Sequence, residues 1–294
     1  MRTAILLAAL LGLGAAAGAR ADPKFVPTAP EARAFHLGAL TLTALHDEQI
    51  VVPNDGKTFA LGVSPSEVGK VLRAAGAPAD RITLSVNALL VRMGRRLILI
   101  DTGLGLRYHG QLLGSLEAAG VSPADVTDVL ISHPHPDHVG GLLDAQGKPA
   151  FTNATIHMAG AAWSWMQQKG APAMAKAVAS RVQTFEPGAS IAPGIVSVSL
   201  PGHTPGHVGY EITSGRSQLM YIGDIAHSSI VSLTRPEWSI EFDSDHVIAN
   251  QTRRKTLSAL ARSGEWVYSP HFPFPGVGHV TAAGSGFAWD PGLP

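Results

Sequence analysis

The chain has 294 residues and a formal net charge of zero, with 45% hydrophobic and 15% charged residues. This composition is that of a globular protein with a sizeable core. The neutral charge gives no electrostatic reason to expect nucleic acid or an anionic membrane as a partner. The sequence has no cysteine, which excludes thiolate nucleophiles, iron–sulfur clusters and cysteine-bound zinc. Any bound metal must therefore be held by histidine, aspartate or glutamate.

The first residues have the pattern of an export signal. Arg2 supplies a positive charge, residues 4–17 form an apolar run, and the Ala-Arg-Ala that ends at Ala21 fits the small-x-small cleavage pattern. A transmembrane anchor is the alternative, but the apolar run is short for a bilayer and no basic stop sequence follows it. We predict a signal peptide over residues 1–21, no membrane contact after its cleavage, and a periplasmic or secreted protein.

Residues 22–294 are predicted to form one domain that begins with an extended arm, residues 22–33, rich in proline and alanine. Apolar, β-branched runs predict strands, and apolar residues at helical spacing predict helices. Strands are expected at residues 40–52, 83–93, 96–100, 126–131, 155–158, 195–200, 210–213, 218–222 and 266–269. Helices are expected at residues 64–74, 111–119, 161–169, 171–180 and 245–262. The 32 glycines and 21 prolines argue against an all-helical bundle.

Three imidazoles and one carboxylate lie within six residues, at His133, His135, Asp137 and His138. Neutral imidazoles and carboxylates are the ligands that zinc, manganese or iron accept. Histidines two apart cannot share a helix face, but they can converge from a strand end that turns into a loop. A chance cluster among 13 histidines is the alternative. The pattern predicts a metal site, and one for two metals.

Four separate apolar strands end in a residue that could bind a metal. The predicted strands are followed by His133, His203, Asp224 and His271. Polar residues at the carboxyl ends of buried strands are where layered α/β folds place their active sites. Each residue alone could be an ordinary turn residue, but their shared position favours one common site.

These motifs resemble the metallo-β-lactamase superfamily. The pattern is His-x-His-x-Asp-His from His133, then Gly-His-Thr-Pro-Gly-His from Gly202, then Gly223-Asp224 and a late His271. The resemblance implies an α/β fold, an αβ/βα four-layer sandwich of two mixed β-sheets flanked by helices.

The resemblance also implies a set of ligands for each of two metal ions. His133, His135 and His203 would bind the first. Asp137, His138 and His271 would bind the second, and Asp224 would bridge the two together with a hydroxide. Two divalent ions per chain are therefore expected, zinc first, with manganese, cobalt and iron as alternatives. Asp137 and Asp224 are the expected catalytic carboxylates.

Two further residues have supporting roles in this interpretation. His207, in the same motif as His203, is expected to be structural. Asp101 follows a strand and is expected to be a hydrogen-bond partner of a metal-bound histidine.

A closer resemblance is to the methyl parathion hydrolase branch of the superfamily. It is carried by Phe-Asp-Ser-Asp at residues 242–245, by the helix to Arg262 and by His-Phe-Pro-Phe-Pro-Gly-Val-Gly-His at residues 271–279. This resemblance implies an exported dimetal hydrolase of lactones, aryl esters or phosphotriesters. It also implies an apolar, aromatic-lined pocket over the metals. The candidates for that pocket here are Trp163, Trp165, His227 and Phe272.

We therefore predict an exported dimetal hydrolase in which a bridging hydroxide attacks a neutral, fairly apolar lactone or aryl ester, with phosphotriester hydrolysis as a promiscuous activity. An organophosphate hydrolase is one alternative. A thioester hydrolase or a β-lactamase is another, and either would need basic residues at the cleft, for which Arg107 and Arg235 are candidates. A di-iron redox protein and a non-catalytic metal-binding protein are the remaining classes. The expected partner is a small-molecule substrate, and a homodimer is left open.

Overall fold

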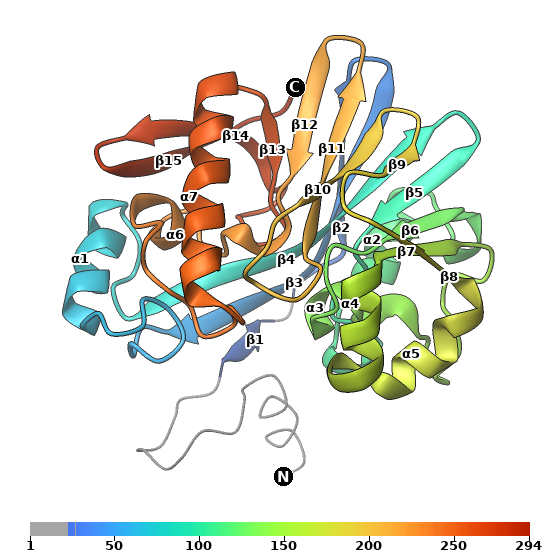
Figure 1. The fold of residues 1–294 in the computed structure, drawn as a ribbon, viewed down its shortest axis with the longest axis horizontal. Coiled ribbons are helices and arrows are strands. Elements are labelled where there is room, and N and C mark those ends of the chain that lie inside the picture. The colour runs from blue at the N-terminus through green and yellow to red at the C-terminus, as the bar shows by residue number, and fades with distance from the viewer. Residues whose placement is uncertain (1–22, 27) are drawn as a thin grey trace.

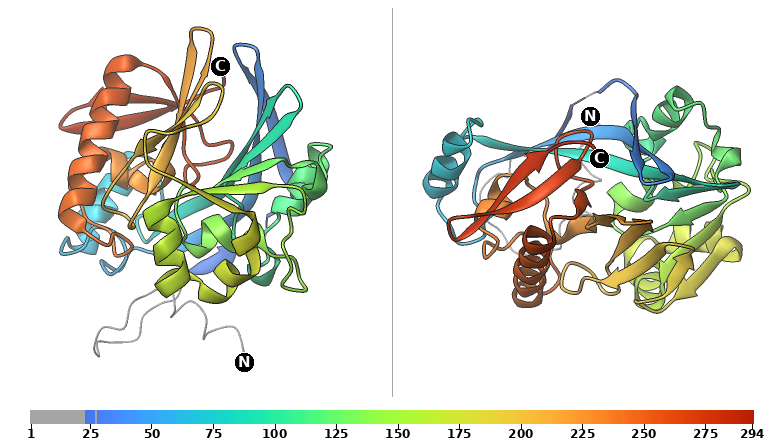
Figure 2. Two further views of the ribbon diagram at one scale, coloured as in Figure 1. Left: turned by 45° about the vertical axis from the view of Figure 1, so that its right-hand side comes forward. Right: turned by 90° about the horizontal axis from the view of Figure 1, so that it is seen from above.

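The computed structural model describes residues 23–26 and 28–294, so the predicted signal peptide lies outside the described residues. Two mixed β-sheets face each other and helices lie outside them (Figures 1 and 2). This architecture confirms the predicted fold class. No helix within the described part of the chain is long and apolar enough to span a membrane.

The first sheet holds the N-terminal half of the chain. Its strands are β1 (Lys24–Val26), β2 (Glu31–Leu37), β3 (Leu40–Pro53), β4 (Arg81–Met93), β5 (Arg96–Ile100), β6 (Asp128–Leu130), β7 (Thr155–Ala159) and β8 (Val182–Phe185). Strands β1 to β5 pair antiparallel, whereas β5 to β8 pair in parallel. The β4–β5 hairpin turns at Gly94, as predicted.

The second sheet holds the C-terminal half. Its strands are β9 (Ser190–Ala192), β10 (Ile195–Ser199), β11 (Val208–Ser214), β12 (Ser217–Tyr221), β13 (Trp266–Tyr268), β14 (Val277–Ala283) and β15 (Gly286–Pro291). They follow one another in order across the sheet, and only β12 and β13 are parallel.

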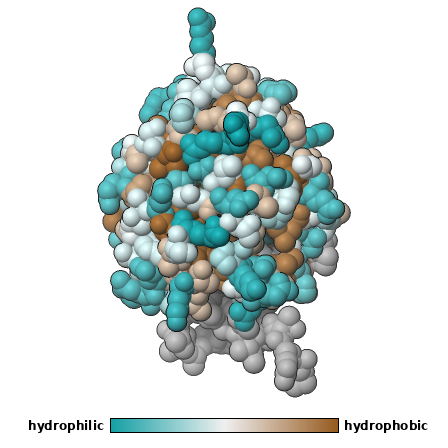
Figure 3. Space-filling model, turned by 90° about the vertical axis from the view of Figure 1, so that its right-hand side faces the viewer, coloured by the Kyte–Doolittle hydropathy of each residue, from teal (hydrophilic) through white to brown (hydrophobic). Residues whose placement is uncertain are grey.

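Helices connect the strands on the outer faces. They are α1 (Pro65–Ala74), α2 (Leu112–Ala118), α3 (Pro136–Val139), α4 (Gly160–Trp165), α5 (Pro172–Val178), α6 (Val231–Thr234) and α7 (His246–Ser263). Helix α7 covers the second sheet beside β14 (Figure 1). Its first turn is capped by Asp245, whose carboxylate accepts the N–H of Ile248 at 2.9 Å. On the face in Figure 3, hydrophilic residues alternate with small apolar groups, as on most folded domains.

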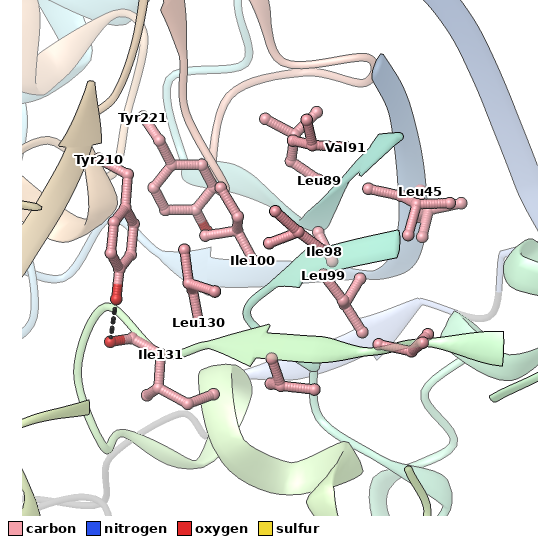
Figure 4. Close-up of a cluster of buried hydrophobic side chains, with 14 of the residues drawn as sticks. Leu45, Leu89, Val91, Ile98, Leu99, Ile100, Leu130, Ile131, Tyr210 and Tyr221 are labelled. Carbon is pink, nitrogen blue, oxygen red and sulfur yellow. Dashed lines mark hydrogen bonds between the residues drawn. The ribbon is translucent and has the colours of Figure 1, made fainter. Parts of the chain in front are cut away.

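The main core lies between the two sheets. Buried aliphatic side chains of β3 to β6 meet the tyrosines of the second sheet (Figure 4). The hydroxyl of Tyr210, fully buried, donates to the carbonyl of Ile131 at 2.8 Å, so the polar atom of this core tyrosine is satisfied. The bond links the second sheet to the residue just before the histidine cluster.

The predicted N-terminal arm is part of the first sheet. Strand β1 pairs with Gln49–Val51 and β2 pairs with Leu40–His46, both along the same long strand β3. The sequence pattern missed these strands because the segment is short and rich in proline and alanine. Pairing with β3 satisfies its backbone and orders it.

Candidate metal centre

The chain brings its strand ends together at one place. His133 and His135 follow β6, and Asp137 lies on α3 next to His138. His203 lies in the turn between β10 and β11. The remaining two ligands follow the parallel strands β12 and β13: Asp224 lies in the 3-10 turn η7 (Gly223–Ile225), and His271 comes three residues after Tyr268. All seven predicted ligands therefore converge between the two sheets.

The first cluster has three imidazoles around one carboxylate. Nε2 of His203 lies 3.2 Å from Nε2 of His133 and 3.0 Å from Nδ1 of His135. An oxygen of Asp224 lies 3.5 Å from Nε2 of His133 and 3.4 Å from Nε2 of His203. These four ligand atoms lie within 4.8 Å of one another, close enough to surround one ion.

The second cluster uses the same Asp224. Its Oδ1 lies 3.2 Å from Nε2 of His138, and its Oδ2 lies 3.1 Å from Nε2 of His271. An oxygen of Asp137 lies 3.5 Å from each of these imidazole nitrogens. Asp224 is the single carboxylate that belongs to both clusters, which is the position predicted for a bridging ligand.

The polar atoms at this centre fit divalent cations. Nε2 of His138 and Oδ1 of Asp224 are buried and have no hydrogen-bond partner among the described residues. Buried polar atoms without a partner are rare in native proteins and call for a missing ligand. The donors are all imidazole nitrogens and carboxylate oxygens, a set that accepts zinc, manganese, cobalt or iron. The ligand assignments themselves stay predictions.

Three imidazoles are fixed by a hydrogen bond on the nitrogen that points away from the centre. Nδ1 of His138 lies 2.8 Å from Asp101, and Nδ1 of His203 lies 2.9 Å from Asp243. Nδ1 of His271 donates to the carbonyl of Ser85 at 2.9 Å. In each case Nε2 is left to face the centre. A hydrogen bond on the other ring nitrogen is the usual support of a metal-binding histidine.

Asp101 has the predicted supporting role. Besides His138, its carboxylate accepts the N–H of Ser132 at 2.8 Å and the hydroxyl of Tyr221 at 2.7 Å. Its φ of +59° is uncommon for a residue other than glycine. These bonds connect β5, β12 and the histidine loop, so Asp101 fixes the position of His138.

Asp243 and Arg253 were missed by the sequence reasoning. The guanidinium of Arg253, 1% exposed, donates to Asp243 at 2.9 Å, and Asp243 in turn holds His203. Arg253 also donates to the carbonyls of Ile225 and Pro236. The motif Phe-Asp-Ser-Asp contains Asp243 but gives no sign of its partner. Arg253 lies 10 positions further along the chain, so no local pattern joins the two residues.

Burial and neighbouring charges set the protonation of the site. Burial and the charge on His203 lower the pKa of His135 to about 3, which favours the neutral ligand form. Burial works against a charge on His203, but its bonds to Asp224 and Asp243 raise its pKa to about 9. Burial also opposes ionisation of Asp224, yet the histidines around it, led by His138, hold its pKa well below its usual range. A cation at the centre would take the place of these protons.

An open pocket leads to the two clusters. It encloses about 670 Å³, including solvent at its open side, and its lining is mostly apolar. The lining residues are Pro23, Phe25, Ile50, Val52, Leu84, Leu104, His135, Asp137, Asp224, His227, Phe242 and His271.

Only one of the four predicted pocket residues lines this pocket. His227 does so, stacked on His271 with ring centroids 5.0 Å apart and with Nε2 3.0 Å from Asp224. Trp165 lies outside the lining, with its ring 6.0 Å from that of His135. Trp163 packs against the main core, and Phe272 is fully buried against Trp289. Aromatic residues near a site are often core, and sequence alone does not separate the two cases.

A sequence profile of the metallo-beta-lactamase superfamily matches residues 81–271, which is more than half of the chain. The chain belongs to the metallo-β-lactamase superfamily. Its matched region begins with strand β4 and ends at His271, so it contains all seven predicted ligands.

Two solved structures resemble this superfamily member over most of its length. AidC, a dizinc quorum-quenching lactonase in complex with a product, is 30% identical, with a TM-score of 0.84 over 90% of this chain and 98% of its own. The hydrolase AbOPH of the beta lactamase superfamily is 31% identical, with a TM-score of 0.81 and the same coverage.

A curated relative is more distant. "Probable metallo-hydrolase Rv2300c" of Mycobacterium tuberculosis is 25% identical over 217 residues, and the match covers 57% of this chain. The match spans 66% of the relative's length, just under two thirds.

Proposed function

We propose that the protein is an exported, metal-dependent hydrolase of neutral, fairly apolar lactones or aryl esters. The observation that carries the proposal is the composition of the pocket. Two carboxylates and three imidazoles line it together with apolar side chains, and no lysine or arginine is among the described residues that line it. Such a pocket suits a substrate with an electrophilic carbonyl and an uncharged apolar group.

The two metal ions, when bound, supply Lewis acidity and lower the pKa of water toward neutrality. The chain's own residues orient the reaction around that chemistry. Asp137 lines the pocket at the second cluster. Burial alone would raise its pKa, but His138 and His271 hold its pKa below its usual range. Asp137 is therefore ionised, and it can accept a proton from the attacking water and pass it to the leaving oxygen.

Zinc is the proposed metal. The similar structure of AidC is described as a dizinc enzyme, and an all-nitrogen and oxygen ligand set accepts zinc. Metal analysis of the purified protein should find about two equivalents per chain.

Phosphotriester hydrolysis is the second candidate activity. The same arrangement of carboxylates and imidazoles polarises a phosphoryl oxygen as well as a carbonyl oxygen. The similarity to AidC, which is described as a lactonase, favours the lactone or ester as the main substrate.

Thioester hydrolysis and β-lactam hydrolysis are less well supported. Both involve anionic substrates, and neither Arg107 nor Arg235 lines the pocket. A fungal relative, an atrochrysone carboxyl ACP thioesterase of Aspergillus fumigatus, is 28% identical over 200 residues but matches over only 42% of its own length.

A substrate panel tests the proposal. Catalytic efficiency is compared for an acyl homoserine lactone, an aryl ester, a phosphotriester, a thioester and a β-lactam, using protein loaded with zinc. We expect the lactone or the aryl ester to have the highest kcat/KM. Turnover of the β-lactam or the thioester alone would refute the proposal. The absence of any turnover with two metals bound would favour a metal-binding protein instead.

Export is proposed from the signal pattern that ends at Ala21. N-terminal sequencing of protein recovered from the periplasm or medium should begin at Asp22. A full-length chain retained in the cytoplasm would contradict export. A homodimer is the proposed assembly, and light scattering of the purified protein decides between a monomer and a dimer.

A further inference from the structure

Strand β3 carries a β-bulge at Asp47. The pairing of β3 with β4 is regular up to His46 and resumes at Glu48, so Asp47 is the extra residue. On the other edge of β3, β2 ends its pairing at His46 and β1 begins at Gln49. Asp47 therefore lies in the gap between two edge strands. Bulges next to active sites commonly redirect one side chain, and here it is a carboxylate.

The carboxylate of Asp47 is fully buried and holds one loop at both ends. This loop, residues 103–111, is called the pocket loop. Oδ2 of Asp47 accepts the N–H of Leu104 at 2.7 Å, and Oδ1 accepts the N–H of Leu112 at 2.8 Å. The carbonyl of Asp47 accepts the N–H of Gln111 at 2.9 Å, in place of the strand that is missing from this edge. Asp47 thus makes two hydrogen bonds to the loop, at Leu104 and Gln111, and a third to Leu112, the first residue of α2 directly after it.

Two glycines let the loop close on the carboxylate. A Cβ on Gly103, whose φ is +65°, would collide with the carboxylate of Asp47. A Cβ on Gly110 would lie 2.6 Å from Oδ1 of the same residue. The backbone can approach the carboxylate this closely only without a side chain at these positions.

The pocket loop contributes to the substrate pocket, and the residue just before it contacts the helix α3 that carries His138. Leu104 lines the pocket, and the ring of Tyr108 stacks on that of Phe25, a second wall residue, at 6.5 Å. Just before the loop, the N–H and the hydroxyl of Thr102 donate to the carbonyl of His138 at 2.8 and 2.9 Å. A movement of the loop would therefore change the apolar wall while leaving the seven predicted ligands attached to their own strands.

We propose that Asp47 is a positioning residue that fixes the pocket loop and thereby sets the affinity of the pocket for the apolar part of the substrate. Asp47 belongs to neither cluster of predicted ligands, although the charge of Asp137 adds to the effects that raise the pKa of Asp47. Its role is to keep Leu104 in the pocket wall and Tyr108 stacked on the wall residue Phe25. The kinetic part of the test rests on the proposed ester hydrolysis, whereas the proteolytic part does not.

The proteolytic test uses Asp47→Asn in the metal-loaded protein. Asparagine keeps the shape of the side chain but turns an amide N–H₂ toward one of the two backbone donors. Arg107 is exposed in the pocket loop and offers a trypsin site. We expect the fragment that ends at Arg107 to form at least about tenfold faster in the variant, because a loosened loop opens locally more often. Asp128→Asn is the matched control, since it removes another buried carboxylate, whose partners Arg96, Thr127 and His157 lie outside the loop.

The kinetic test compares 4-nitrophenyl hexanoate with 4-nitrophenyl acetate. In Asp47→Asn we expect KM for the hexanoate to rise about tenfold, while kcat for the acetate stays within about twofold, because only the apolar contact is lost. Loss of a residue that merely stabilised the fold would not raise KM for the hexanoate selectively. If Asp47→Asn does not fold, Gly110→Ala displaces the loop without altering the buried carboxylate, and the same two results are expected.

The outcomes separate the two proposals. Faster cleavage at Arg107 without turnover of either ester by the wild type would support Asp47 as the anchor of the loop and refute aryl esters as substrates. Unchanged cleavage at Arg107 in a folded variant, or an equal change of KM for both esters, would overturn the role of Asp47.

Discussion

The backbone N–H of Asp224 donates to Nε2 of His207 at 3.0 Å, and Nδ1 of His207 donates to the carbonyl of Leu200 at 2.9 Å. His207 therefore links the end of β10 to the carboxylate shared by the two clusters. Burial and the charge on His203 lower its pKa to about 3, so the ring is neutral and its tautomer is fixed by these two bonds. The expectation that His207 has a structural role agrees with this geometry.

Removal of that imidazole should loosen the shared carboxylate. His207→Ala leaves the buried N–H of Asp224 without a partner, at a cost of about 1–3 kcal/mol. We expect metal affinity to fall roughly 10- to 100-fold, as for other supporting partners of metal ligands. Competition with a chromophoric chelator measures the affinity. His36→Ala, an exposed histidine on β2, is the control and should bind metal like the wild type. Unchanged affinity in His207→Ala would show that Asp224 is held in place without it.

The buried pair of Asp243 and Arg253 should contribute strongly to stability. Arg253→Met leaves the carboxylate of Asp243 buried without its cation, and breaking such a pair costs about 3–5 kcal/mol. Denaturation by urea should show this loss in the free energy of unfolding. The neighbouring Arg254→Met removes an exposed ion pair with Glu237 and should cost only about 0–1 kcal/mol. Equal losses in the two variants would contradict the role given to Arg253.

The residues of the two clusters could be picked out from sequence because they are local signals. Four of them lie within six residues, and His203, Asp224 and His271 each follow an apolar run that was recognisable as a strand. The resemblance that these motifs have to the metallo-β-lactamase superfamily implied the two facing sheets. Pattern and spacing therefore sufficed for the clusters that the structure brings together, and the resemblance supplied the fold class.

The walls of the pocket could not be predicted in this way. Phe25 reaches the pocket because β1 pairs with the far half of β3, and Asp47 reaches the pocket loop through a bulge. Neither pairing leaves a periodic signal in the chain. Phe272 had the right residue type beside a ligand, but its side chain turns into the core of the second sheet, so proximity in sequence was misleading.

Stability at acid pH should depend on Asp128. Burial alone would raise its pKa, but hydrogen bonds from His157 and Arg96 hold its pKa below the usual range. A carboxyl group with a depressed pKa stabilises the fold above its unfolded pKa of about 4, and this contribution is lost as the pH falls. The difference in the free energy of unfolding between the wild type and Asp128→Asn should therefore shrink as the pH drops from about 5 to about 3. Urea titrations at several pH values measure it, and a difference that stays constant would contradict the shift.

The central claim is that two metal ions share Asp224 and that hydrolysis needs both. The most direct measurement is lactone or ester turnover while zinc is titrated into metal-free protein, beside the same titration of Asp224→Ala. Turnover in the wild type should rise to a plateau at about two equivalents per chain and stay near zero in Asp224→Ala, because the bridging carboxylate serves both ions. Full turnover without metal, or a plateau at one equivalent that Asp224→Ala also reaches, would contradict the account.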